Sequence, residues 1–333
     1  MKSDVWNAKP GQFASDGSYF YGVEAGTREV YLATLDPRSG KVVGEVRPIS
    51  ASPHGMLGNP QWSPDGRSVS YLAARTGTTP VITIRSVESG AVREIPVPHE
   101  LVYSTHRWFS DGRSLALTGV PKGRRGLFRM DLQSAKTEPL FMLEPEEYIP
   151  GARAFELMPG DSTVVMSKVM PAKGSVTQDL LVRNLRTQAE RVLYHPTEIL
   201  GVALSVSRDG RQVAFTEGLR PAQLKVVSLE GGSPRRVGET FIARTHSPVA
   251  WSADGRSIFA VSAAPTGNLN TIWRLPVDGG APDSIGVTAE TITEMRLDAT
   301  GRRLLFIAGN PVGELWVMEH ILRDGKQTVG AIR

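Results

Sequence analysis

The chain has 333 residues, of which 40% are hydrophobic and 22% charged, and it contains no cysteine. This composition is typical of a globular protein with a sizeable core, and it excludes disulfide bonds, thiolate metal sites and a cysteine nucleophile. The formal charge of +4 comes from 38 basic and 34 acidic residues spread along the sequence. Nucleic-acid-binding proteins usually concentrate their basic residues in a stripe, so we expect no nucleic-acid partner.

The first seven residues lack the apolar core of a secretory signal, and no apolar run approaches the length of a membrane span. Two explanations fit: a cytoplasmic protein, or a domain of a longer chain whose targeting or membrane segment precedes it. The early start of the strand pattern favours the second, which would place the domain in the periplasm or elsewhere outside the cytoplasm. The compartment stays open, and we expect a monomer without a membrane span.

A tight Asp-Gly turn recurs along the chain, preceded by an apolar or aromatic residue and followed by an alternating strand. In the fourth copy the Gly and the Asp are exchanged, and in the seventh Thr replaces the Asp. The copies are marked by Asp16, Asp65, Asp111, Gly160, Asp209, Asp254 and Thr300. Their successive spacings are 49, 46, 49, 49, 45 and 46 residues. A period in the forties built from short strands indicates a β-propeller.

Each repeat is predicted to form a blade of four antiparallel strands, A to D, because period-two alternation is interrupted by glycine-bearing turns. The second repeat shows the plan most clearly, with strands at 60–63, 68–73, 81–87 and 91–97. We predict a single all-β domain over 1–333, a seven-bladed propeller with approximate blades at 8–48, 58–97, 105–143, 152–194, 201–238, 248–286 and 293–333.

A six-bladed ring is the alternative, and it would follow if the fourth repeat, with its altered turn, were not a blade. The 49-residue spacings on both sides of that repeat argue against this alternative. The outer strand of the last blade is expected from 327–332 or from 4–7, and the sequence does not choose between them.

The motif Trp-Ser-x-Asp-Gly-Arg, seen at 62–67 and 251–256, resembles the WD-like repeats of bacterial TolB-like propellers. The closing stretch 300–319 is similar to the end of such domains. The resemblance covers essentially the whole chain, and it implies a binding or sensor module of a larger bacterial signalling protein. The blades also resemble those of prolyl oligopeptidase-type enzymes, whose chemistry lies on an attached α/β-hydrolase domain with a Gly-x-Ser-x-Gly motif. That motif is absent from this sequence.

The most regular polar and aromatic residues have structural explanations. The repeated aspartates occupy equivalent turns on separate blades, where Asp-Gly suits the backbone, so we expect them to shape turns. The tryptophans Trp62, Trp108 and Trp251 recur at one position of the repeat, and we expect them to pack between blades.

Five of the six histidines fall between the last strand of one repeat and the first of the next: His54, His99, His106, His195 and His246. Propeller geometry gathers these connections on one face around the channel. Imidazoles that converge there could bind a divalent metal, as in propeller lyases that act on uronic-acid sugars. Their spacing matches no ligand motif, so we expect no metal and no cofactor. The candidates for ligand binding at the channel mouth are His54, His106, Arg107, Arg153 and His246.

Two charged loops on the same face are candidates for contact with a partner: the basic Lys122, Arg124 and Arg125, and the acidic Glu144, Glu146 and Glu147. We interpret the chain as a non-catalytic binding or sensor module for a protein, peptide or small ligand. The alternatives are a metal-dependent propeller lyase or hydrolase acting on a carbohydrate, and a structural scaffold.

Overall fold

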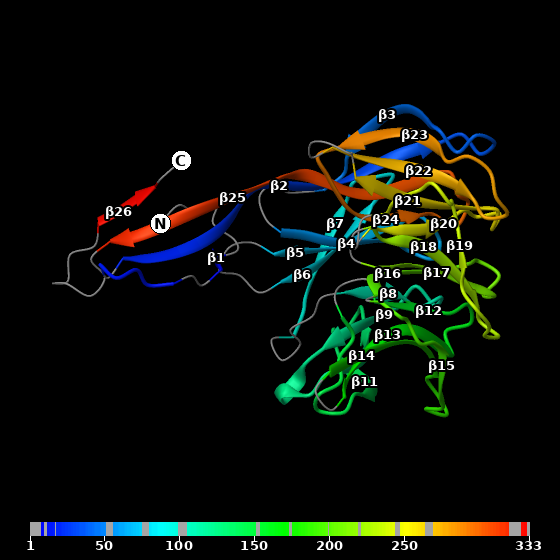
Figure 1. Ribbon diagram of the computed structural model, residues 1–333, viewed down its shortest axis with the longest axis horizontal. Coiled ribbons are helices and arrows are strands. Elements are labelled where there is room, and N and C mark those ends of the chain that lie inside the picture. The colour runs from blue at the N-terminus through cyan, green and yellow to red at the C-terminus, as the bar shows by residue number, and fades with distance from the viewer. Residues whose placement is uncertain are drawn as a thin grey trace.

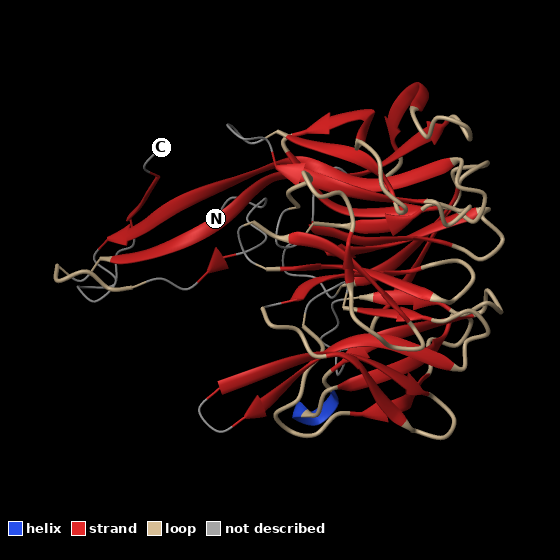
Figure 2. Ribbon diagram, turned by 45° about the vertical axis from the view of Figure 1, so that its right-hand side comes forward, coloured by secondary structure: helices blue, strands red, loops and turns tan. Residues whose placement is uncertain are grey.

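The chain forms a ring of β-sheets around a central axis, with a long two-stranded extension to one side (Figure 1). The computed structural model describes residues 8–9, 12–16, 18–50, 56–74, 80–98, 105–150, 154–172, 175–198, 200–218, 221–243, 247–263, 269–319 and 328–331. These residues contain six sheets and a single short 3₁₀ helix at Pro121–Gly123. Strands therefore dominate the architecture (Figure 2).

Five blades are four-stranded antiparallel sheets built from consecutive chain segments. Blade I contains β4 (Met56–Trp62), β5 (Ser68–Ala74), β6 (Val81–Ser86) and β7 (Val92–Pro96). Blade II contains β8 (His106–Trp108), β9 (Ser114–Gly119), β10 (Gly126–Asp131) and β11 (Thr137–Met142). Blade III contains β12 (Phe155–Leu157), β13 (Thr163–Ala172), β14 (Ser175–Asn184) and β15 (Glu190–Tyr194). Blade IV contains β16 (Leu200–Val206), β17 (Gln212–Glu217), β18 (Gln223–Ser228) and β19 (Arg235–Arg236). Blade V contains β20 (Val249–Trp251), β21 (Ser257–Ala263), β22 (Asn270–Pro276) and β23 (Asp283–Ala289).

The two ends of the chain build blade VI together. Its inner strands are β24 (Thr291–Leu297) and β25 (Arg303–Glu319), and its outer strands are β2 (Tyr19–Leu35) and β3 (Val42–Pro48). The register between β2 and β25 is continuous from Tyr19 opposite Met318 to Thr34 opposite Arg303. This antiparallel ladder closes the ring.

The prediction of seven blades is therefore wrong, and the propeller has six. The first and seventh repeats are the two halves of one blade, because β2 and β25 use each other as hydrogen-bonding partners. The fourth repeat, whose loss would have explained a six-bladed ring, is a complete blade in spite of its altered turn. The outer strand of the closing blade is β3, and of the two segments expected there the described residues 328–331 pair with β25 on its extension beyond the ring instead. Residues 4–7 lie outside the described part of the chain.

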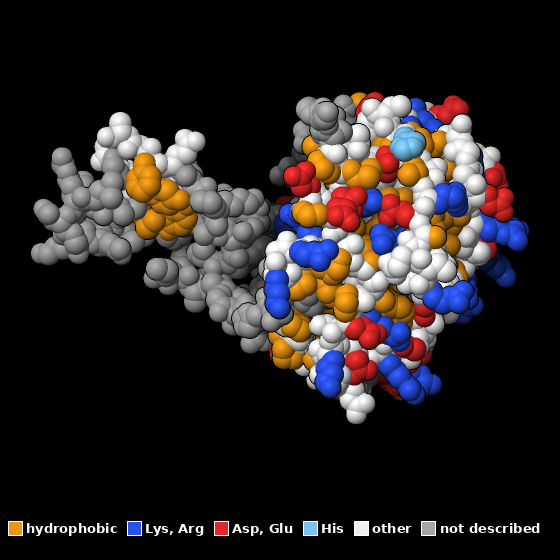
Figure 3. All heavy atoms as spheres, turned by 90° about the horizontal axis from the view of Figure 1, so that it is seen from below, with side chains coloured by type: hydrophobic (Ala, Val, Ile, Leu, Met, Phe, Trp, Pro, Cys, Tyr) orange, Lys and Arg blue, Asp and Glu red, His pale blue; other side chains and the backbone are white. Residues whose placement is uncertain are grey.

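The amino-terminal half of β2 and the carboxy-terminal half of β25 continue beyond the ring as a two-stranded arm (Figure 1). Two short strands extend this arm on either side: β1 (Ala8–Lys9) pairs with β2, and β26 (Thr328–Ala331) pairs with β25. The first copy of the turn motif, with Asp16, lies on the arm and accepts a hydrogen bond from the Ser18 N–H at 2.9 Å. The arm occupies the place of the B–C connection of blade VI. Hydrophobic side chains gather on it, while the visible face of the ring carries intermixed charges of both signs (Figure 3).

The core lies between the blades, as six hydrophobic clusters that each join two neighbouring blades. In β9, Leu115 and Leu117 pack toward blade I, whereas Ala116 packs toward blade III. Alternating side chains of a strand point to opposite faces of its sheet, so an inner strand buried on both faces needs an apolar residue at nearly every position. None of the helices among the described residues could cross a membrane.

Candidate functional site

The aspartates of the A–B turns hold the backbone of those turns. Asp65 accepts a hydrogen bond from the Ser63 hydroxyl at 2.6 Å and another from the Arg67 N–H at 3.0 Å. These two bonds lower the pKa of the Asp65 carboxyl. Asp209 and Asp254 repeat the arrangement in their own blades. The structure confirms that these carboxylates stabilise turns.

The recurrent tryptophans fasten neighbouring blades to each other, as expected. The Trp62 indole donates to the Arg296 carbonyl at 3.3 Å, and the Trp251 indole donates to the Ser205 carbonyl at 3.0 Å. Trp108 donates to the Ser70 hydroxyl at 2.8 Å. In each case the acceptor belongs to the preceding blade, so each indole combines apolar packing with one directional bond.

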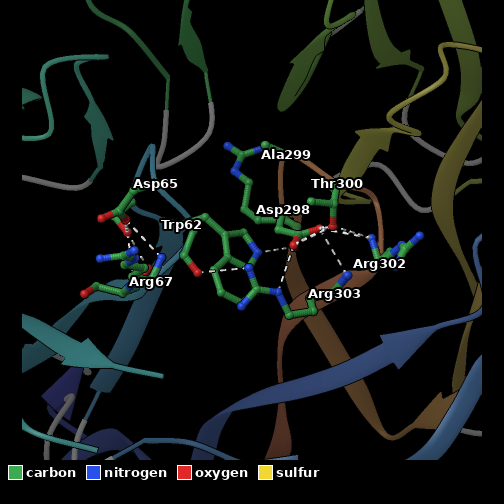
Figure 4. A network of polar contacts seen from close by, with 12 residues as sticks. Trp62, Asp65, Arg67, Asp298, Ala299, Thr300, Arg302 and Arg303 are labelled. Carbon is green, nitrogen blue, oxygen red and sulfur yellow. Dashed lines mark hydrogen bonds and ion pairs between the residues drawn. The ribbon is translucent and has the colours of Figure 1, made fainter. Parts of the chain in front are cut away.

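Where blade VI meets blade I, one arginine organises the contact (Figure 4). The Arg303 guanidinium lies 4.3 Å from the centre of the Trp62 ring, donates to the Asp298 carboxylate at 2.8 Å, and reaches the Gly66 carbonyl at 2.9 Å. Asp298 is itself buried and also accepts from the Thr300 hydroxyl. This network joins the first complete blade to the blade that closes the ring.

A cavity of about 470 Å³ opens on the axis of the propeller, at the end that carries the A–B turns. All six innermost strands line it. Each strand contributes the residue directly before the apolar or aromatic residue that begins its turn motif, as Gln61 precedes Trp62. Six equivalent positions therefore face the same channel: Gln61, Arg107, Glu156, Ser205, Ala250 and Arg296.

Two arginines share one carboxylate inside this cavity. Arg107 Nε lies 2.8 Å from Glu156 Oε2, and Arg296 Nη2 lies 2.6 Å from Glu156 Oε1. Glu156 belongs to blade III and Arg296 to blade VI, which lie three blades apart on opposite sides of the ring. The Glu156–Arg296 ion pair therefore reaches across the channel.

Arg107 is held by several further contacts. Its Nη1 atom donates to the Thr105 hydroxyl at 3.0 Å and to the His106 carbonyl at 2.8 Å. Burial lowers the pKa of Arg107 to about 10; the positive charge of Arg296 adds to this effect and Glu156 opposes it. The guanidinium therefore stays charged at neutral pH while its solvation is largely lost.

Arg208 lies at the mouth of the cavity. It projects from the turn of blade IV and donates to the Ala299 carbonyl of blade VI at 2.6 Å, so it passes over the edge of blade V. Arg208 is exposed, whereas Arg107 and Arg296 lie deeper. The lining at the mouth thus includes the positive charge of Arg208 as well as Asp161, and the floor of the cavity is formed by Arg107, Glu156 and Arg296.

The structure places the predicted channel residues in different surroundings. Arg107 lies in the cavity. His106 points between blades I and II, where its Nε2 atom lies 2.8 Å from the Ser70 hydroxyl. Burial, together with the charges of Arg107 and Arg296, lowers the pKa of His106 to about 3, so the imidazole is neutral. His54, Arg153 and His246 lie outside the described residues, as does His99.

The two charged loops do not form ion pairs with each other among the described residues. Glu147 instead lies 3.1 Å from the Lys168 ammonium, which also binds Glu190 at 2.6 Å. The Arg125 guanidinium lies 5.5 Å from the centre of the Tyr148 ring. The remaining members of the two loops are exposed or partly exposed: Lys122, Arg124, Glu144 and Glu146. These loops lie at the opposite end of the blades from the cavity.

Reasoning from the sequence missed Gln61, Glu156, Arg296 and Arg208. Aligning the repeats on their turns would have found the first three, since they occupy the same motif position as Arg107. Charged side chains at this position, namely Arg107, Glu156 and Arg296, are informative because the position faces the axis in every blade. Within the described residues, no group of three His, Asp or Glu side chains is arranged to hold a metal ion.

Comparison with known proteins gives a fold and a distant relative. No family model matches the chain. It is 28% identical over 205 residues to the uncharacterized peptidase YuxL of Bacillus subtilis (strain 168), a match that covers 60% of this chain but only 28% of that protein. The chain therefore spans well under half the length of this relative.

The solved structures that it resembles are β-propellers of low sequence identity. A putative TolB from Agrobacterium tumefaciens has a TM-score of 0.65 at 15% identity, covering 86% of this chain and 100% of that one. TolB from Acinetobacter baumannii has a TM-score of 0.53 at 14% identity, covering 86% of this chain and 64% of that one. An oligogalacturonate lyase in complex with manganese has a TM-score of 0.55 at 13% identity, covering 97% and 84%. These neighbours include both TolB proteins and an enzyme, and they establish that the chain has the TolB-like β-propeller fold.

Proposed function

We propose that this propeller is a non-catalytic binding module whose ligand enters the axial cavity from the end that carries the A–B turns. The observation that carries the proposal is the cavity itself. Its volume of about 470 Å³ lies in the range of ligand pockets, and every blade contributes to its wall.

The lining of the cavity supports binding. Trp62, Trp108 and Trp251 supply apolar surface to the lining, which also contains the charged side chains of Arg107, Glu156 and Arg296. Binding sites commonly combine a largely apolar wall with a few fixed polar groups that orient the ligand. The ion pairs of Glu156 with Arg107 and Arg296 hold these polar groups at defined positions on the axis.

Peptides are the ligand class that we favour. The relative from Bacillus subtilis is named as a peptidase, and the part of it that this chain matches is a minor part of its length. A cavity that opens at the end of the A–B turns can accept the terminus or a protruding side chain of a peptide.

Selection from a phage-displayed library of random peptides tests the proposal. The wild-type propeller is compared with Ala250→Phe, which fills the cavity from one of the six axial positions. The matched control is Ala91→Phe, the same change at an exposed residue of blade I. Thermal melting of all three proteins checks that they fold.

We expect peptides that bind the wild type and Ala91→Phe but bind Ala250→Phe at least about tenfold more weakly, which corresponds to 1.4 kcal/mol or more. Peptides that bind all three proteins equally would show that the cavity is not the site. A selection that enriches no peptide would contradict a peptide-binding function.

A further inference from the structure

Two buried nitrogen atoms in the cavity lining have no hydrogen-bond partner among the described residues: Arg107 Nη2 and Gln61 Nε2. Both residues are more than nine-tenths buried, with Arg107 3% exposed and Gln61 6% exposed. They lie on the innermost strands of adjacent blades, at the same level of the channel. A buried donor without an acceptor costs about 1–3 kcal/mol, so this corner favours a group that brings an acceptor.

The charges of the floor are also unevenly matched. The Glu156 carboxylate gives one oxygen to each of two guanidiniums, so two positive charges share one negative charge. The carboxylate of Glu294 also attracts the Arg107 guanidinium electrostatically, but more weakly than Glu156 and without a hydrogen bond. One additional carboxylate would give each guanidinium a partner of its own.

We propose that the cavity contains a subsite for a carboxylate of the ligand. The ligand carboxylate pairs with Arg296 and accepts hydrogen bonds from Arg107 Nη2 and Gln61 Nε2, while Glu156 stays on Arg107 Nε. This inference rests on the proposed function and names the chemical group that the cavity recognises.

A carboxylate fits these donors better than a phosphate does. Guanidinium and carboxylate are both planar and match each other through two parallel hydrogen bonds. One added negative charge gives Arg296 a partner of its own, whereas a phosphate with close to two charges would be repelled more strongly by Glu156 and Glu294. Arg208 at the mouth attracts the same anion toward the channel.

The two donor nitrogens are covered, so the ligand reaches them only when a side chain above them moves. The Arg296–Glu156 pair is the contact that crosses the channel. Exchange of Glu156 for the ligand carboxylate on Arg296 would open the floor without leaving a guanidinium unpaired. In this proposal, the Arg296–Glu156 pair separates as the ligand carboxylate binds to Arg296.

The carboxylate can belong to an acidic side chain or to the end of a peptide, and small probes separate the two sources. N-acetyl-glutamate N-methylamide carries only the side-chain carboxylate, N-acetyl-glycine carries only the terminal one, and N-acetyl-glutamine N-methylamide is the uncharged control. Each is titrated into the ¹⁵N-labelled propeller at constant pH and ionic strength, and dissociation constants are obtained from the chemical shifts of the backbone amides.

We expect at least one carboxylate probe to bind about 10- to 100-fold more tightly than the amide control, as is typical when a charged hydrogen-bonding partner is lost. Gln61→Leu should weaken that probe about three- to tenfold, since it removes one buried donor that has no partner among the described residues. Arg107→Met should weaken it more. The matched control is Arg183→Met, which also breaks an Arg–Glu pair but lies on blade III away from the cavity.

Equal affinities for the carboxylate and amide probes, or unchanged binding by Gln61→Leu, would overturn the subsite. Gln61→Leu keeps the test decisive even if Arg107→Met fails to fold. Failure of the subsite is distinguishable from failure of the proposed function. In the first case selected peptides still lose binding in Ala250→Phe, but replacing their carboxylates by amides has no effect; in the second, no peptide depends on the cavity.

Discussion

His106 shows how a single buried side chain joins two blades. Trp108 donates its indole hydrogen to the Ser70 hydroxyl, which also lies 2.8 Å from His106 Nε2. This chain of contacts runs from blade II to blade I and back. Burial keeps the imidazole neutral by lowering its pKa to about 3. The residue that the sequence suggested for the channel mouth thus has a structural role in this network.

We predict that His106 makes the protein less stable as the pH falls below about 6.5. The pKa of His106 is about 3 in the folded state and 6.5 for the unperturbed side chain, so the unfolded chain takes up the proton first. Between pH 7.5 and 5.5 this group should lower the free energy of unfolding by about 1.4 kcal/mol. Urea unfolding at both pH values should show that loss in the wild type and its absence in His106→Gln. An equal dependence on pH in both proteins would contradict the burial of a neutral His106.

At the scale of the element, the closing blade is the feature that holds the ring together. Its outer strands come from the amino-terminal part of the chain and its inner strands from the carboxy-terminal part. On β2, Leu32 packs with Leu305 of β25 and with Val69 and Tyr71 of blade I. One amino-terminal residue thereby contributes both to the closure and to the next interface between blades.

We predict that Leu32→Ala lowers the free energy of unfolding by about 2–4 kcal/mol, the usual range for a buried leucine. Leu117→Ala, in the uninterrupted blade II, should cost a similar amount, because both side chains are nearly or fully buried. Leu269→Ala, at a 51% exposed position, serves as the control and should cost well under 1 kcal/mol. If Leu32→Ala were as mild as the control in denaturant unfolding, β2 would not be part of the ring.

The strands and turns of the blades followed from the sequence, because Asp-Gly turns and period-two alternation act locally. The number of blades did not. The first motif copy, at Asp16, has the same local signature as Asp65, yet it lies on the arm. Whether a hairpin starts a blade of its own or completes another depends on the partner of β2, which lies nearly the whole chain away at β25. No local pattern encodes that choice.

At the scale of the whole molecule, an ion pair in the channel connects two blades that share no hydrophobic cluster. The hydrophobic clusters join only neighbours, whereas the Glu156–Arg296 pair joins opposite blades III and VI. Sequence reasoning placed Arg107 near the axis but missed both of these residues. The reason is physical: an ion pair between residues 140 positions apart forms only after six blades have set the diameter of the channel.

We predict a strong energetic coupling between Glu156 and Arg296. Glu156→Gln leaves the buried Arg107 and the partly buried Arg296 without their carboxylate, so it should cost about 3–5 kcal/mol, whereas the same change in the Arg296→Met background should cost less. A double-mutant cycle from denaturant unfolding should give a coupling of more than about 1 kcal/mol. The Arg129–Asp111 pair, within blade II and with both side chains more exposed, is the control and should give about 0.2–1 kcal/mol. A Glu156–Arg296 coupling no larger than that of the control would mean that the contact across the channel does not stabilise the ring, and opposite blades would then depend on their neighbours alone.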